Sequence, residues 1–241
     1  MNLIEDYSPN YSKKPRSKKD IKFVIIHYTG MQSEIESIKR LKNPKFKVSC
    51  HYLINRKGNV IQLIKDKYIA WHAGKSKWKK FINLNRNSIG IELTNKGHQF
   101  GYENFSTKQI SSLIKLCKNL KKKYHIKKSN FLGHSDIAPL RKDDPGEKFP
   151  WKKLSTYNFG NWYLEKKYNI KKSVIKSKEI VFFKNLHKLG YRYFNIKKRS
   201  LKDKKVIKSF QRHFLPKNVT GKIDQKTFKI SHFLTHKIHN S

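Results

Sequence analysis

Two histidines and an aspartate, far apart in the chain, could together hold a metal ion. His27 ends the apolar run "IKFVIIH", and His134 follows the shorter run "NFLG". Asp144 comes after a proline-containing turn that can fold its carboxylate back toward His134. Either histidine alone would more often be structural, but the ends of buried strands commonly converge at one edge of a sheet. Two imidazoles and one carboxylate are the ligands of an open catalytic zinc site, so we predict one here.

A carboxylate and a lysine could assist such a metal. Glu92 alternates onto the polar face of the strand-like run "SIGIELT", which makes it either a surface charge or a general base that takes a proton from water. Lys142, two residues before Asp144, is either one lysine among many or the charge that stabilises the oxyanion of a tetrahedral intermediate. The residue pattern alone leaves both alternatives open.

The segment "IAWHAG", residues 69–74, places an indole and an imidazole side by side. Trp71 and His72 could be a core tryptophan beside a surface histidine. They could also form a groove wall that packs on a sugar or a peptide, with His72 supplying a hydrogen bond. We predict substrate contacts for both residues and interpret His51 as structural.

The elements that must position these side chains follow from hydrophobic periodicity. Apolar runs predict strands at residues 21–27 and 88–94, and residues 49–64 alternate around the turn signal "KGN", which predicts a hairpin. Residues 106–124 have apolar positions at helical spacing and begin with a capping box. Strands interleaved with helices indicate an α/β class, with a mixed sheet flanked by helices.

The stretch "GHSDIAPLRKDDPG", residues 133–146, contains two of the candidate ligands. Its glycines and prolines predict a loop of fixed shape rather than a regular helix or a central strand. We interpret its remaining aspartates, Asp136 and Asp143, as residues that support the ligands or shape the turn.

The sequence pattern changes after Trp151. A helix is expected around residues 157–168, followed by a polar linker, and three short amphipathic segments at 180–189, 203–214 and 224–234 then predict a small helical domain. The expected division is a leader at 1–20, a catalytic domain at 21–168, a linker at 169–176 and a helical domain at 177–241.

The composition limits the classes of partner. Hydrophobic residues make up 37% of the 241 residues, which excludes a disordered chain. The net charge of +40 favours a polyanion such as nucleic acid, an anionic membrane or an acidic cell-wall polymer. The excess is nearly all lysine spread along the chain, whereas bidentate phosphate and guanine contacts favour arginine. We therefore favour a generally solvated lysine surface and expect no specific nucleic-acid partner.

The sequence shows no disulfide framework, export signal or membrane span. Cys50 and Cys117 lie far apart and are interpreted as buried small residues. The first twenty residues contain no continuous apolar segment, and no later run has the length of a membrane-spanning helix. The compartment therefore stays open between the cell envelope and the cytoplasm.

Five stretches in this order resemble a known enzyme family: "FVIIHYT", "SCHYLI", "AWHAG", "NSIGIEL" and "GHSDIAPLRKDDPG". They are similar to the zinc-dependent N-acetylmuramoyl-L-alanine amidases of the type 2 amidase family, over about residues 20–155. The resemblance is greatest to the branch that acts on anhydro-capped and ordinary muropeptides in Gram-negative bacteria. It implies a mixed sheet flanked by helices and one zinc ion held by His27, His134 and Asp144. It also implies Glu92 as the catalytic glutamate and Lys142 as the catalytic lysine.

The C-terminal stretches "LHKLGY", "VIKSFQRHF" and "TGKIDQKT" are similar to a small three-helix peptidoglycan-binding domain. The landmarks of that domain are present as Gly190-Tyr191, Phe210-Gln211, Gly221, Asp224 and Thr227. The resemblance therefore implies a wall-binding unit attached to the catalytic domain.

Together these features predict a monomeric bacterial zinc hydrolase of cell-wall turnover or muropeptide recycling. The resemblance implies that it cleaves the amide between N-acetylmuramic acid, ordinary or 1,6-anhydro, and L-alanine of the stem peptide. A non-catalytic protein that binds peptidoglycan or another polyanion on the same scaffold is the first alternative. A basic nucleic-acid-binding protein is the second, and it rests on charge alone.

Overall fold

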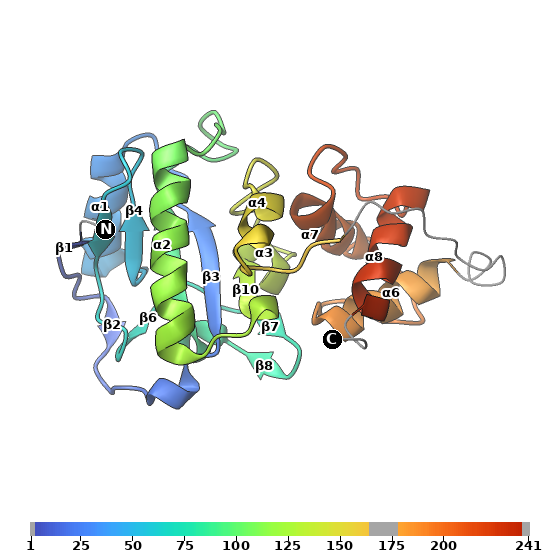
Figure 1. Cartoon of the computed structure of the whole chain (residues 1–241), viewed down its shortest axis with the longest axis horizontal. Coiled ribbons are helices and arrows are strands. Elements are labelled where there is room, and N and C mark those ends of the chain that lie inside the picture. The colour runs from blue at the N-terminus through green and yellow to red at the C-terminus, as the bar shows by residue number, and fades with distance from the viewer. Residues whose placement is uncertain (1–2, 164–177, 238–241) are drawn as a thin grey trace.

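The computed structural model describes residues 3–163 and 178–237 and is built on a six-stranded sheet (Figure 1). The strands lie in the order β1 (Leu3–Glu5), β5 (Val60–Gln62), β4 (Tyr52–Ile54), β9 (Ser88–Leu93), β3 (Phe23–Tyr28) and β10 (Phe131–Gly133). Only the predicted hairpin pair, β4 with β5, is antiparallel among these neighbours. The sheet is therefore mixed, and with its helices it confirms the predicted α/β class.

The register of the central strands sets the position of two candidate site residues. In the parallel pair β3 and β9, His27 lies opposite Glu92, so both side chains emerge on the same face of the sheet. Ile89, Ile91 and Leu93 point to the other face and are fully buried. The alternation predicted from "SIGIELT" is confirmed.

One long helix covers that apolar face (Figure 1). Helix α2 (Thr107–Tyr124) begins after Ser106, and the predicted capping box with Gln109 is formed. The buried Gln109 amide also donates to the backbone oxygens of Ile54 and Thr94, at 3.2 and 2.9 Å. The cap therefore also fixes the start of α2 to the ends of two strands.

The opposite face of the sheet carries several smaller elements. Helix α1 (Glu34–Lys42) packs there over β4 and β5, and the small antiparallel pairs are β2 (Tyr11–Ser12) with β6 (Ile69–Ala70) and β7 (Lys77–Trp78) with β8 (Phe81–Ile82). The 3₁₀ turns are η1 (Lys18–Asp20), η2 (Pro44–Phe46), η3 (Leu84–Asn87) and η4 (Lys128–Asn130).

Residues 3–20, expected as a leader, fold together with the sheet. Strand β1 pairs with β5, and β2 pairs with β6. The guanidinium of Arg16 is buried and donates to the backbone oxygens of Asp66 and Ser88, at 3.0 and 2.7 Å. This segment therefore contributes hydrogen bonds and strands to the catalytic part of the molecule.

The stretch 133–146 departs in one respect from the loop that its sequence predicts. Residues His134–Ile137 form helix α3, a single turn, before Pro139 and Pro145 interrupt regular structure. The carboxylate of Asp136 accepts the Gly133 N–H at 2.8 Å and closes the start of this turn. The prolines lie after the helical turn, which is why they do not prevent it.

Helix α4 (Trp151–Thr156) follows, and residues 157–163 form no helix. Residues 164–168 of the helix expected here, and the expected linker 169–176, lie outside the described residues. Cys50 and Cys117 are buried and free, as predicted. Within the described ranges, no helix is both long and apolar enough to cross a membrane.

Three helices form the C-terminal region, close to the predicted ranges: α6 (Lys178–Leu189), α7 (Asp203–Phe214) and α8 (Gln225–Lys237). They lie beyond strand β10 (Figure 1). Phe182 and Phe210 belong to the same buried hydrophobic cluster as Phe23, Ile25 and Leu132 of the sheet. The C-terminal helices therefore share a hydrophobic core with the face of the sheet that carries His27.

Candidate metal centre

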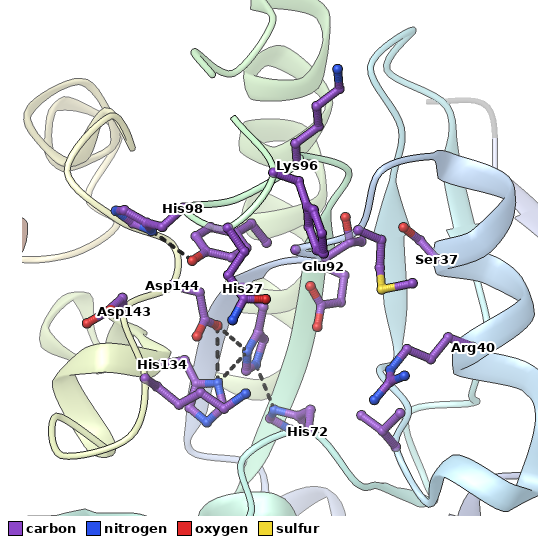
Figure 2. A pocket seen from close by; sticks show the side chains of 18 of the residues that line it. His27, Ser37, Arg40, His72, Glu92, Lys96, His98, His134, Asp143 and Asp144 are labelled. Atoms are coloured by element: carbon purple, nitrogen blue, oxygen red, sulfur yellow. Dashed lines mark hydrogen bonds and ion pairs between the residues drawn. The ribbon is translucent and has the colours of Figure 1, made fainter. Parts of the chain in front are cut away.

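The three predicted metal ligands meet at one point (Figure 2). Nδ1 of His27 lies 3.0 Å from Nδ1 of His134, and Oδ2 of Asp144 lies 2.9 and 3.1 Å from these two nitrogens. All three side chains are buried. Two imidazole nitrogens and a carboxylate oxygen therefore converge as a set of metal ligands, of the type that catalytic zinc sites use.

The backbone explains how residues so far apart meet. His27 is placed by the central strand β3, and His134 is the first residue of α3, directly after β10. The N–H of Ser135 donates to the backbone oxygen of Asp144 at 2.8 Å, which joins the two ends of the loop. A Cβ at Gly133 would lie only 2.7 Å from Cδ of Pro145, so glycine permits this close approach.

The electrostatics of the three side chains favour a bound cation. Burial, together with the nearby His134, lowers the pKa of His27 to about 4, so its imidazole is neutral at pH 7. Burial alone would raise the pKa of Asp144, but the charge interaction and the hydrogen bond with His134 hold it well below its usual range. Two imidazoles beside an ionised carboxylate fit a zinc ion.

The ligands open into a cavity of about 660 Å³. Glu92 and Lys142, the predicted catalytic pair, both line it, and the cavity extends between the ligand loop and α1 (Figure 2). Several further cations line the same cavity: Arg40, Lys96 and Arg141. The structure therefore brings six of the seven predicted site residues to one cavity, His72 included, and surrounds them with positive charge.

Glu92 has an unusual environment for a carboxylate. Its Oε2 atom is buried and has no hydrogen-bond partner within the described part of the chain. Burial, and to a lesser extent the charge of Asp144, raises the pKa of Glu92 to about 8. A carboxyl group with such a pKa, beside the metal ligands, can both accept and return a proton near neutral pH.

The structure separates the two predicted substrate contacts. The indole N–H of Trp71 donates to Oγ of Ser12 at 3.1 Å, and Trp71 does not line the cavity. His72 does line it, but the ring is buried and both its nitrogens contact protein groups, His27 and Ser88. A direct substrate contact by either residue stays a prediction. His51 is fully buried and accepts the Gly90 N–H at 3.0 Å, which fits its structural interpretation.

Sequence reasoning missed other cavity residues. Arg40 lies on α1, and Lys96 and His98 lie in the loop after β9, close to the strand that carries Glu92. The phenol of Tyr28, next to His27 in the chain, is 2.8 Å from Nδ1 of His98. Their positions directly after a site-bearing strand were the available signal for Lys96 and His98. No local pattern distinguishes Arg40 from the other basic residues.

A family model described as N-acetylmuramoyl-L-alanine amidase matches residues 17–147, a range that contains all of these site residues. The chain belongs to this amidase family. The family named from the sequence stretches is thereby confirmed, and the protein is an amidase.

Individual amidases of the family match over more of the chain. N-acetylmuramoyl-L-alanine amidase AmiD of Escherichia coli K12 is 36% identical over 232 residues, which cover 90% of this chain and 83% of AmiD. The 1,6-anhydro-N-acetylmuramyl-L-alanine amidase AmpD of Haemophilus influenzae is 34% identical over 164 residues, 61% of this chain and 86% of AmpD. The chain thus matches AmiD over a longer range than this AmpD.

Solved amidase structures share the fold. AmiD of E. coli in complex with anhydro-N-acetylmuramic acid-L-Ala-D-gamma-Glu-L-Lys matches with a TM-score of 0.78 and 31% identity, over 95% of this chain and 93% of that chain. AmpDh3 from Pseudomonas aeruginosa also gives a TM-score of 0.78, at 29% identity, over 96% of this chain and 97% of its own. At this coverage the likeness extends over the C-terminal helices of the amidase.

Proposed function

We propose that this amidase uses one zinc ion, held by His27, His134 and Asp144, to hydrolyse muropeptides. The bond cleaved is the amide between N-acetylmuramic acid, ordinary or 1,6-anhydro, and L-alanine of the stem peptide. The convergence of three buried ligands beside the unpaired Glu92 carboxylate carries this proposal. The complex of AmiD with an anhydro-N-acetylmuramic acid peptide supports the substrate class.

The chemistry divides between the metal and the residues around it. Zinc, when bound, lowers the pKa of water and polarises a carbonyl group. Glu92 takes a proton from the water that attacks the scissile carbonyl carbon, and returns it to the alanine nitrogen as the C–N bond breaks. Lys142 supports the negative charge that develops on the carbonyl oxygen. Because both residues line the cavity with the ligands, one bound amide can be near all of them.

The other cavity cations suit the rest of the substrate. A stem peptide carries carboxylates, and the exposed side chains of Arg40 and Lys96 supply positive charge at the cavity wall. We infer that these side chains orient the peptide. We also propose a monomer as the working unit.

We propose that the C-terminal helices are a small peptidoglycan-binding domain, so that residues 21–168 and 177–241 form the catalytic and binding parts. Several landmark residues of the sequence resemblance hold the helices together. The side chain of Gln211 donates to Thr227 at 3.0 Å and accepts the Gly221 N–H at 2.7 Å. These contacts support the proposed domain type, and a sacculus pull-down at rising salt tests the binding.

The amidase proposal is tested with defined muropeptides. The zinc-loaded and the chelated protein are incubated with anhydro-capped and with ordinary muropeptides, and free stem peptide is detected by mass spectrometry. We expect release with zinc and none after chelation. No release from either substrate would contradict the catalytic proposal and favour a binding protein on this scaffold. A steep salt dependence of DNA binding, without zinc in the purified protein, would instead favour the nucleic-acid alternative.

A further inference from the structure

The outer nitrogen of one metal ligand contacts a second histidine that no proposal above uses. Nε2 of His27 lies 3.0 Å from Nδ1 of His72, on the side of the ring opposite the other ligands (Figure 2). Nε2 of His72 is in turn 3.1 Å from Oγ of Ser88, and that oxygen is 2.6 Å from the backbone oxygen of Leu84. A chain of hydrogen bonds therefore leads from the candidate metal centre to a backbone carbonyl.

The carbonyl end fixes the direction of every bond in this chain. The oxygen of Leu84 has no proton, so the Ser88 hydroxyl must donate to it, and Oγ is left to accept from His72. With its proton on Nε2, the neutral His72 ring presents a lone pair at Nδ1. The shared proton between the two imidazoles must then belong to Nε2 of His27. The remaining nitrogen, Nδ1 of His27, carries a lone pair that faces Asp144 and His134.

Burial supports the neutral state that this chain requires. His72 is buried and its two ring nitrogens contact only another imidazole and a hydroxyl group, surroundings that favour the uncharged ring. A lone pair on Nδ1 of His27, 2.9 Å from a carboxylate oxygen of Asp144, is unfavourable unless a cation lies between them. The hydrogen-bond chain therefore prepares His27 to bind a metal ion.

The position of the His72 ring is itself fixed by the fold. A Cβ at Gly90 would lie only 2.4 Å from Cγ of His72, so the ring occupies space that only glycine leaves on this face of β9. The side-chain oxygen of Asn85 accepts the backbone N–H groups of His72 and Ala73, at 3.1 and 2.6 Å. The "AWHAG" and "SIGIE" stretches therefore fit together so that the His72 ring has one fixed position.

His134 lacks an equivalent support. Its Nε2 lies 3.2 Å from the backbone oxygen of Ala73 and also 3.2 Å from the guanidinium of Arg141. One neighbour accepts and the other donates, so these contacts permit either tautomer of His134. The chain of hydrogen bonds therefore fixes the tautomer of His27 but not that of His134.

We propose that His72 is a positioning residue, which holds His27 in the Nε2–H tautomer and fixes its ring orientation for the metal. This inference rests on the proposed metal site and goes beyond the ligands themselves. Groups that hydrogen-bond to metal-ligating histidines commonly change metal affinity by about 10–100-fold when they are removed.

Two variants test the proposal, and their new side chains, Asn and Leu, are similar to each other in size and shape. His72→Asn keeps an acceptor oxygen near the position of Nδ1, whereas His72→Leu removes it. Zinc affinity is measured by competition with a chelator, and the tautomer of His27 in the metal-free protein by ¹⁵N NMR. We expect wild type and His72→Asn to show the Nε2–H tautomer. We expect His72→Leu to shift to the Nδ1–H tautomer, donating to Asp144, and to bind zinc about 10–100-fold more weakly.

A further variant tests the proposal even if His72→Leu does not fold. Ser88→Ala leaves His72 in place but removes the acceptor of its Nε2–H, so a measurable, smaller loss of zinc affinity is expected. Circular dichroism and thermal melting identify the folded variants. Wild-type zinc affinity and an unchanged His27 tautomer in the folded variants would overturn the positioning role.

These measurements separate this inference from the proposed function. If zinc affinity and tautomer change as expected while even wild type releases no stem peptide, the amidase proposal fails and the role of His72 stands. If His72→Leu instead raises KM for muropeptide with unchanged zinc affinity, His72 contacts substrate and the positioning role is wrong.

Discussion

The two sides of the metal centre are built in different ways. His27 belongs to a central strand, where the sheet register and the His72 chain determine its position. His134 and Asp144 belong to the stretch 133–146, which packs against the C-terminal helices. The first side depends on the sheet that the amidase family shares. The second depends in addition on contacts with residues more than fifty positions later in the chain.

Asp136 makes several of these contacts with residues far along the chain. Its carboxylate is 1% exposed and accepts hydrogen bonds from the Tyr191 hydroxyl at 2.5 Å and from Nδ1 of His213 at 2.8 Å, in addition to the Gly133 N–H. The Ser209 hydroxyl of α7 donates to the backbone oxygen of Ser135 at 2.8 Å. The C-terminal region therefore also holds the ligand loop in place.

The largest expected effect is at the loop side. His134→Ala removes a ligand, so we expect loss of zinc from the purified protein and loss of turnover on muropeptides together. Metal analysis and stem-peptide release measure the two effects. The matched variant is His125→Ala, which changes a histidine at the C-terminal end of α2 and should leave both unchanged. Retention of wild-type zinc content by His134→Ala would remove His134 from the ligand set.

The next effect separates turnover from metal binding at the sheet side. Glu92→Gln keeps the shape of the side chain but cannot carry a proton, so we expect turnover to fall about 100- to 10,000-fold with zinc content and fold retained. Stem-peptide release, metal analysis and circular dichroism measure this. Cleavage by Glu92→Gln at the wild-type rate would show that another group moves the proton.

Asp136→Ala tests the contribution of the C-terminal helices. It leaves Tyr191 and His213 without their buried acceptor, and we expect the free energy of unfolding to fall by about 3–5 kcal/mol, with weaker zinc binding. Denaturant titration and chelator competition measure the two effects.

The control is Asp143→Ala, in the same loop. Asp143 is about half exposed and pairs with Arg212 of α7 at 2.9 Å, and such pairs contribute about 0–1 kcal/mol. Equal destabilisation by Asp136→Ala and Asp143→Ala would mean that the buried contacts of Asp136 are no more important than this surface pair.

The smallest effect is a change of the free energy of unfolding with pH, measured in metal-free protein. Its sign is opposite for Glu92 on the sheet side and Asp144 on the loop side. The folded state raises the pKa of Glu92 from 4.5 to about 8, so it holds that proton more tightly than the unfolded chain does. Glu92→Gln should therefore become more stable than wild type as the pH rises from about 4.5 to about 8, by up to a few kcal/mol. Above that pH the difference stays constant.

Asp144 is the matched group on the loop side. Its pKa is lowered in the fold, so the stability that it contributes is present above its unfolded pKa of 3.8 and is lost as the pH falls further. Unfolding titrations of Glu92→Gln, Asp144→Asn and wild type across this pH range measure both trends. Parallel trends for the two carboxylates would contradict the different environments assigned to them.

The sequence alone predicts the sheet side of the molecule well. The β-branched run before His27, the alternation around Glu92 and the capping box of α2 are local patterns, and each was confirmed. The grouping of His27, His134 and Asp144 was also predicted, since residues at the ends of buried strands converge.

Features that depend on distant contacts could not be predicted in this way. Strand β1 is three residues long with exposed apolar side chains, so no periodicity marks it as part of the sheet. The groups that hydrogen-bond to Asp136 belong to Tyr191 and His213, which come much later in the chain. Asp136 is buried because these residues pack against it. Likewise, "AWHAG" indicates that Trp71 and His72 are adjacent, but only the fold shows which groups their ring nitrogens meet.

The pairing of His27 with Glu92 across β3 and β9 has a consequence for how this chain can diverge. Side chains alternate between the two faces of a strand, so inserting or deleting one residue in either strand would turn one partner to the α2 side of the sheet. Loops around the cavity can change length without this penalty. Variation in length among sequences that keep this chemistry should therefore concentrate in the loops, while the spacing within these two strands stays constant.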